Sequence, residues 1–130
     1  MGSVEIFLNF PIYDMNLNVL WKNPNKTDPE QVERMNSFWG DQSWVDSVYE
    51  PTRTLFGDEI QKRIDYLVAI TRAFQERLIK HAAFKYVPEP IPMLNSKNGV
   101  LYYLFFASHK PVAAKILTHI FTKYKKKVRL

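Results

Sequence analysis

The sequence predicts a small α/β protein, and three observations lead to that class. Residues 4–8 and 100–107 are compact runs of aliphatic and aromatic side chains, typical of strands buried on both faces. Residues 58–83 contain neither Pro nor Gly and repeat apolar side chains at helical spacing. Strands that alternate with helices along the chain are the pattern of α/β folds.

The composition predicts one packed domain spanning residues 1–130. Of the 130 residues, 46% are hydrophobic and 15% aromatic, which is enough for a single core. Cysteine is absent, which excludes disulfides, zinc–thiolate sites and a cysteine nucleophile, and fits a cytoplasmic setting. No apolar run approaches the roughly 18 residues of a membrane span. Residues 4–10 also lack the basic leader and cleavage site of a signal peptide.

The net charge is +5, and much of the excess lies at the C-terminal end. The basic side chains there are Lys123, Lys125, Lys126, Lys127 and Arg129. Such a tail is a candidate nucleic-acid contact, because lysine and arginine neutralise phosphate backbones. It also fits the solvated end of a helix, where positive side chains complement the helix dipole.

The first strand is predicted to stop at Asn9, Phe10 and Pro11, because proline cannot continue a strand ladder. Short helices are predicted to follow. The best defined of them is capped by Thr27 or Asp28 and ends at Gly40. Residues 41–49 add one or two further helical turns.

One long helix is predicted over residues 58–83. Asp58 and Gln61 resemble a capping box at its start. The residues predicted to face the core are spaced alternately by four and three: Ile60, Ile64, Leu67, Thr71, Phe74 and Leu78.

Residues 84–107 are predicted to form an antiparallel hairpin. Its first strand is predicted at residues 84–87, and the prolines that follow permit only a position at a sheet edge. Asn98-Gly99 marks a turn before the second strand at 100–107. A last helix at about 111–125 is predicted from an apolar stripe: Val112, Ile116, Leu117, Ile120, Phe121 and Tyr124. A three-stranded sheet leaves hydrophobic edges open, which predicts a homo-oligomer or a missing sheet half.

Three stretches resemble one family. They are IFLNFPIYDMNLN at 6–18, MNSFWGDQSW at 35–44 and LYYLFFASHKP at 101–111, the last followed by Ala114-Lys115-Ile116. Together they are similar to the three-Cys-motif partner (TcmP) proteins over nearly the whole chain. The resemblance implies a Rossmann-like fold similar to class I S-adenosylmethionine-dependent methyltransferases. It also implies a protein partner that carries three clustered cysteines.

Under this resemblance the chain is the C-terminal, substrate-side half of such a domain, a fragment or truncated form with a three-stranded mixed sheet. A full-length relative would bind S-adenosylmethionine through a Gly-rich loop after its first strand. The 4 glycines of this chain, at positions 2, 40, 57 and 99, form no such cluster. We therefore expect no cofactor and no demonstrable activity for this chain alone.

The Asn9-Phe10-Pro11 corner is the first candidate for chemistry. It resembles the corner of amino-methyltransferases, in which a side-chain oxygen accepts hydrogens from an exocyclic amine and an aromatic ring stacks on the base. Here Asn9 would be the acceptor, Pro11 part of the corner and Tyr13 the stacking residue. Phe10 replaces the usual proline, however, and the aromatic residue comes one position late. The alternative is a strand end with an Asn cap and Phe10 in the core.

Several polar residues are weaker candidates. Asp14, Asn16 and Asn18 follow the corner and could line the same crevice, although such residues also cap helices. His109, beside Ser108 at the predicted end of the second hairpin strand, is a further candidate for this crevice. No His, Asp or Glu spacing indicates a metal site.

Two further function classes remain open. Helices followed by a hairpin with a Lys/Asn/Gly tip also describe a winged-helix nucleic-acid-binding module, which the basic charge would suit. A third possibility is a pure interaction domain that pairs through its open sheet edge.

Overall fold

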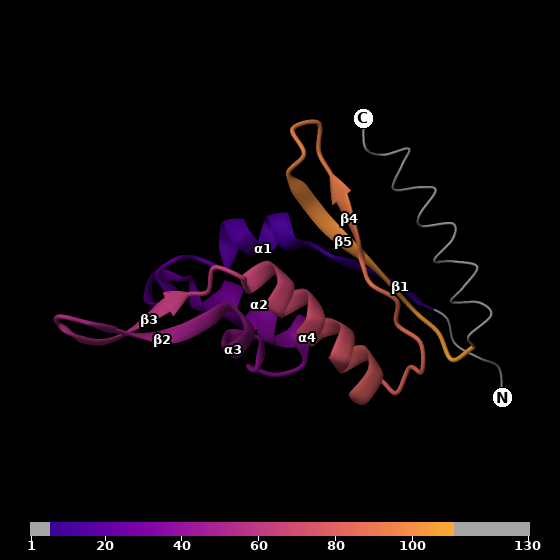
Figure 1. Cartoon of the computed structure of the whole chain (residues 1–130), viewed down its shortest axis with the longest axis horizontal. Coiled ribbons are helices and arrows are strands. Elements are labelled where there is room, and N and C mark those ends of the chain that lie inside the picture. Colours follow the sequence, from indigo (N-terminus) through magenta and orange to yellow (C-terminus); the bar gives the residue numbers. More distant parts are fainter. Residues whose placement is uncertain (1–5, 111–130) are drawn as a thin grey trace. The chain divides into compact units, whose positions relative to one another are not determined.

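A computed structural model describes residues 6–110 (Figure 1). The described chain forms two compact units, one made of residues 6–13 and 75–110 and the other of residues 14–74. The boundaries between the units fall within two helices, α1 (Ile12–Asn18) and α4 (Tyr66–Lys80). The C-terminal helix predicted at 111–125 lies outside the described residues.

The first unit contains a three-stranded sheet made of β1 (Ile6–Phe10), β5 (Val100–Ala107) and β4 (Ile91–Leu94), in that order. The predicted number of strands is confirmed for this sheet, but the mixed pairing is wrong. Both neighbouring pairs are antiparallel, because β5 returns between β1 and β4 and separates the two strands that run in the same direction. The fold is therefore α/β only in the broad sense that it contains both helices and strands.

The β4–β5 hairpin is confirmed, but its first strand lies at Ile91–Leu94 and not at the predicted residues 84–87. Asn95 shapes its turn, since its Oδ1 accepts hydrogen bonds from the backbone N–H groups of Lys97 and Gly99, both at 2.9 Å. Pro92 lies in β4, and β4 is an edge strand as proline requires. Residues 84–87 are not a strand. They contribute a single bridge, in which Tyr86 and Ser108 exchange two backbone hydrogen bonds of 2.9 Å.

Burial on both faces holds for β5 but not for β1. Phe105 is 0% exposed and packs edge-on against Phe10 with ring centroids 5.8 Å apart. Phe106, on the opposite face, belongs to a cluster with Ile91 and Met93. In β1 the alternate side chain of Phe7 is 55% exposed, so the described part of this strand has one buried face.

The second unit begins with helices, and its best-defined helix has the predicted ends. In α2 (Pro29–Trp39), Asp28 is the N-cap and its Oδ1 accepts from the N–H of Glu30 at 2.9 Å. Gly40 ends the helix in the left-handed region, with φ 108°. A short helix, α3 (Trp44–Val48), follows, and its Trp44 Nε1 donates to Asn36 Oδ1 at 2.7 Å.

The long helix predicted at 58–83 is wrong in its first third. Residues there form β3 (Gly57–Lys62), which pairs antiparallel with β2 (Tyr49–Thr54), and α4 starts only at Tyr66. Ile60 and Ile64 matched the helical stripe but are 59% and 97% exposed. Gly57 permits the turn because it has φ 117°, a conformation that favours glycine.

The remainder of α4 is helical, as predicted. In the second unit its Phe74 ring stacks on Phe38, with centroids 5.5 Å apart. The helix stops before Ala83, which adopts φ 60°, and the N–H of Phe84 bonds back to the carbonyl of Leu78 at 3.0 Å. Within residues 6–110, none of the helices has the length and apolarity needed to cross a bilayer.

Candidate functional site

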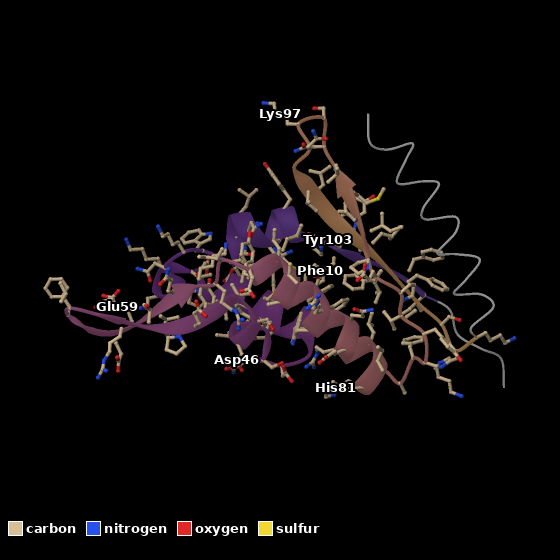
Figure 2. The ribbon with its side chains drawn as sticks, in the orientation of Figure 1. Phe10, Asp46, Glu59, His81, Lys97 and Tyr103 are labelled. Atoms are coloured by element: carbon tan, nitrogen blue, oxygen red, sulfur yellow. The ribbon has the colours of Figure 1, made fainter. Side chains whose placement is uncertain are left out.

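The Asn9-Phe10-Pro11 corner lies at the end of β1, which runs two residues further than predicted. Asn9 is still in the strand, opposite Leu104, and its side chain is exposed. Phe10 is fully buried against Phe105, as the core alternative anticipated. Figure 2 places Phe10 beside Tyr103, its register partner. Pro11 then separates the strand from α1.

The hydrogen-bonding pattern of β5 determines which residues of β1 direct their backbone groups away from β5. Ser108 directs its N–H and C=O toward Tyr86, on the β4 side. Because backbone groups alternate between the two edges of a strand, Phe105 and Tyr103 direct theirs toward β1. Their partners Leu8 and Phe10 face β5 in return. The backbone of Asn9 consequently points away from β5, to an edge on which no strand of residues 6–110 pairs.

Tyr13, Asp14 and Asn18 lie along α1. The Tyr13 side chain is half exposed. Asn18 Nδ2 donates to Asp14 Oδ1 at 2.9 Å and to the Asp14 carbonyl at 3.1 Å. The second Asp14 oxygen is 4.0 Å from Arg34. These contacts are those of a helix surface whose polar groups satisfy one another.

Asn16 belongs to a partly buried cluster that the sequence did not predict. Its Oδ1 accepts from the Tyr66 hydroxyl at 3.0 Å and lies 3.4 Å from Lys62 Nζ. Lys62 also donates to the carbonyl of Leu20 at 2.6 Å, and its ammonium lies 4.0 Å from the centre of the Tyr66 ring. Burial lowers the pKa of Lys62. The ammonium is thus held inside the second unit by an amide, a carbonyl and an aromatic face.

Tyr49 makes a similar contact from the neighbouring strand. Its hydroxyl donates to the carbonyl of Trp21 at 2.5 Å, and burial raises its pKa to about 12. Tyr49 and Lys62 are register partners at the base of the β2–β3 hairpin. This cross-strand pair therefore donates hydrogen bonds to the adjacent backbone carbonyls of Leu20 and Trp21.

A groove of about 780 Å³ lies beside this hairpin. The residues that line it come from the loop after α1 and from both strands: Lys22, Asn23, Pro24, Asn25, Thr52, Thr54, Asp58, Glu59, Ile60 and Gln61. Figure 2 shows Glu59 on the projecting hairpin. This groove was not predicted, because it depends on the β2–β3 hairpin, whose second strand was predicted to be helical.

His109 is distant from the corner within the first unit. Its ring stacks on Phe84 with centroids 4.9 Å apart. Because β5 is antiparallel to β1, the end of β5 lies at the start of β1: Ala107 pairs with Ile6, whereas Asn9 pairs with Leu104. The register therefore places His109 beyond the start of β1 and Asn9 near the end of β1.

Two further expectations from the sequence concern the basic tail and metal ions. The residues of the basic tail, 123–129, lie outside the described part of the chain. Across residues 6–110, His, Asp and Glu side chains form no group of three that could hold a metal ion. Comparison of the chain with protein-family models, curated proteins and solved structures found no match in any of the three.

Proposed function

We propose that the chain is the substrate-side part of a methyltransferase-like protein of the three-Cys-motif partner type, whose sheet is completed at the outer edge of β1. One observation supports this most strongly. The backbone N–H and C=O of Asn9 point to an edge on which no described strand pairs. Such an edge is a template for a further strand.

The strand directions are compatible with this proposal. β1 and β4 run parallel to each other, and β5 runs antiparallel between them. A strand added alongside β1 in the same direction would extend the sheet in the manner of an α/β fold. Ligands of such folds bind beyond the carboxyl ends of the strands. For β1 that end is the Asn9-Phe10-Pro11 corner, with the exposed amide of Asn9 as the hydrogen-bond acceptor.

The described glycines support the expectation that this chain alone does not hold S-adenosylmethionine. Gly40 ends α2, Gly57 starts β3 and Gly99 lies in the β4–β5 turn. None of them lies between a strand and the start of a helix, where a nucleotide-type cofactor is held. Titration calorimetry of the chain with S-adenosylmethionine should give no binding heat. Saturable binding would contradict the proposal that this chain alone does not hold the cofactor.

In the isolated chain, a second copy is the strand donor that this edge would meet. β1 of one copy can lie against β1 of the other, as in two-fold dimers with matching surfaces. Asn9→Pro removes the outward N–H and leaves the inward ladder to β5 intact, whereas Asn9→Ala keeps that N–H. Light scattering should give a dimer mass for the wild type and Asn9→Ala, and a monomer mass for Asn9→Pro. A monomeric wild type would exclude self-association.

A further inference from the structure

The β2–β3 hairpin projects from the helices of the second unit (Figure 1) and carries exposed apolar side chains. Leu55 and Phe56 at its tip are 100% and 95% exposed, and Ile60 is exposed along β3. No third strand among residues 6–110 pairs with it. A two-stranded hairpin is only marginally stable in water without a further strand or packing partner. The hairpin thus has the properties of a surface that binds another chain.

Only one of its two edges is suited to accept a strand. Thr54 and Gly57 flank the two-residue turn and form a hydrogen-bonded pair, so their backbone groups face the paired strand. At the base of the hairpin the Arg63 N–H donates to the Val48 carbonyl at 2.7 Å, which is the same alternation of inward and outward residues. The outward backbone groups of β2 therefore include Pro51, which has no N–H. Those of β3 belong to Asp58 and Ile60, which both keep donor and acceptor.

The groove follows this competent edge. Four consecutive β3 residues, 58–61, line it together with Thr52 and Thr54 of β2, whose backbone groups face β3, whereas Pro51 and Arg53 of the outer β2 edge do not. Its opposite wall is the loop at residues 22–25, which the Lys62 and Tyr49 hydrogen bonds anchor through the preceding carbonyls. A wall on one side and a strand edge on the other leave a channel for an extended chain.

The groove is lined by two carboxylates, Asp58 and Glu59, and one lysine, Lys22, so its lining is acidic on balance. Glu59 makes no ion pair within the described residues, and Asp58 has only a 4.0 Å contact with Arg53 in which both side chains are highly exposed. An exposed pair of this kind contributes little. Lys62 is turned inward onto Leu20. Ile60, between these carboxylates and Lys62, offers an apolar contact.

We propose that the outer edge of β3 binds an extended segment of a partner protein in which basic and apolar residues alternate. The segment adds to β3 as a third strand, with its basic side chains on the face of Glu59 and its apolar side chains on the opposite face, against Ile60. This inference does not depend on the proposed methyltransferase-like function, since it involves only the second unit.

A labelled octapeptide of four Lys-Val repeats tests the proposal by fluorescence anisotropy against the full chain. We expect saturable one-to-one binding to the wild type. Ile60→Pro, which removes an outward N–H, should weaken binding at least tenfold. Ile60→Thr, which keeps that N–H, should bind within about threefold of the wild type, as the apolar contact is a smaller term. Arg53→Pro, on the opposite edge, should bind like the wild type. Absence of binding, or equal loss in Ile60→Pro and Arg53→Pro, would overturn the proposal.

A peptide variant separates strand addition from simple charge attraction and does not depend on the folding of any mutant. The same octapeptide, N-methylated at alternate amides, keeps its charge but cannot donate to β3. Two such peptides exist, one methylated at the odd amides and the other at the even amides. One of the two should bind at least tenfold more weakly than the parent. Glu59→Lys should weaken the parent peptide as well. If both methylated peptides bind as tightly as the parent and only added salt releases them, the contact is non-specific and the proposal fails.

Discussion

Removal of the Tyr49 hydroxyl is the perturbation whose effect the structure specifies best. The hydroxyl donates to the Trp21 carbonyl at 2.5 Å, and the ring is buried. Tyr49→Phe keeps the ring and deletes one hydrogen bond, which typically contributes about 1 kcal/mol net. We therefore expect the free energy of unfolding at pH 7 to fall by about 1 kcal/mol in Tyr49→Phe.

The stability difference between the wild type and Tyr49→Phe should also depend on pH. Burial raises the Tyr49 pKa from 10.0 to about 12. A folded-state pKa above the unfolded one means that the neutral phenol stabilises the fold fully below pH 10, and that this contribution is lost as the pH rises through about 12. After allowance for solvent screening, a pKa rise of this size corresponds to about 1–2 kcal/mol. The advantage of the wild type over Tyr49→Phe should therefore vanish between these pH values.

Urea unfolding followed by tryptophan fluorescence measures both effects. All three tryptophans lie in the second unit, so the signal reports the unit that contains Tyr49. The other tyrosines are common to both proteins, and their titration cancels in the difference. Equal stability at pH 7 together with a difference that is constant up to pH 12 would refute the assigned hydrogen bond and burial.

The structure makes four further predictions. Phe105→Ala, at a fully buried position in β5, should lower the free energy of unfolding by about 3–5 kcal/mol in urea followed by far-UV circular dichroism. Lys62→Met keeps the aliphatic stem but loses the bond to Leu20, and should cost about 1–2 kcal/mol in the tryptophan-detected urea transition. Asp28→Ala removes the α2 cap and should cost about 1 kcal/mol, which a lower thermal midpoint would show, whereas Asp28→Asn should be nearly neutral. Gly40→Ala, at φ 108°, should cost at least about 1 kcal/mol in the same melt, and a neutral result would contradict the left-handed cap.

Local signals in the sequence predicted those elements whose ends depend on neighbouring residues. Asp28 and Gly40 cap α2 through their own backbone surroundings, so the sequence placed both ends of the helix. The Asn98-Gly99 turn and the apolar run after it predicted the β4–β5 hairpin for the same reason. The β2–β3 hairpin was missed because Ile60 and Ile64 continue the spacing of α4 although they are exposed. Gly57 and the threonines of β2 were the available signals against a helix.

The candidate sites were less predictable because they join residues far apart in the chain. Lys62 and Tyr66 meet Asn16 across some fifty residues, and no spacing in the sequence records that contact. Asn9 was predicted to stop the first strand but lies inside β1, and the outward direction of its backbone depends on the register with β5. His109 was grouped with the corner only because both end strands, and the antiparallel register separates them.

Amide hydrogen exchange at Asn9 tests the central claim, that the outer edge of β1 is a site of strand addition. The inward-facing amide of Leu8 serves as the reference within the same strand. If β1 pairs with a second copy, the Asn9 amide should be protected like Leu8 at high protein concentration and should exchange faster on dilution. An Asn9 amide that exchanges at the unprotected rate at every concentration, beside a protected Leu8, would contradict strand addition at this edge in the isolated chain.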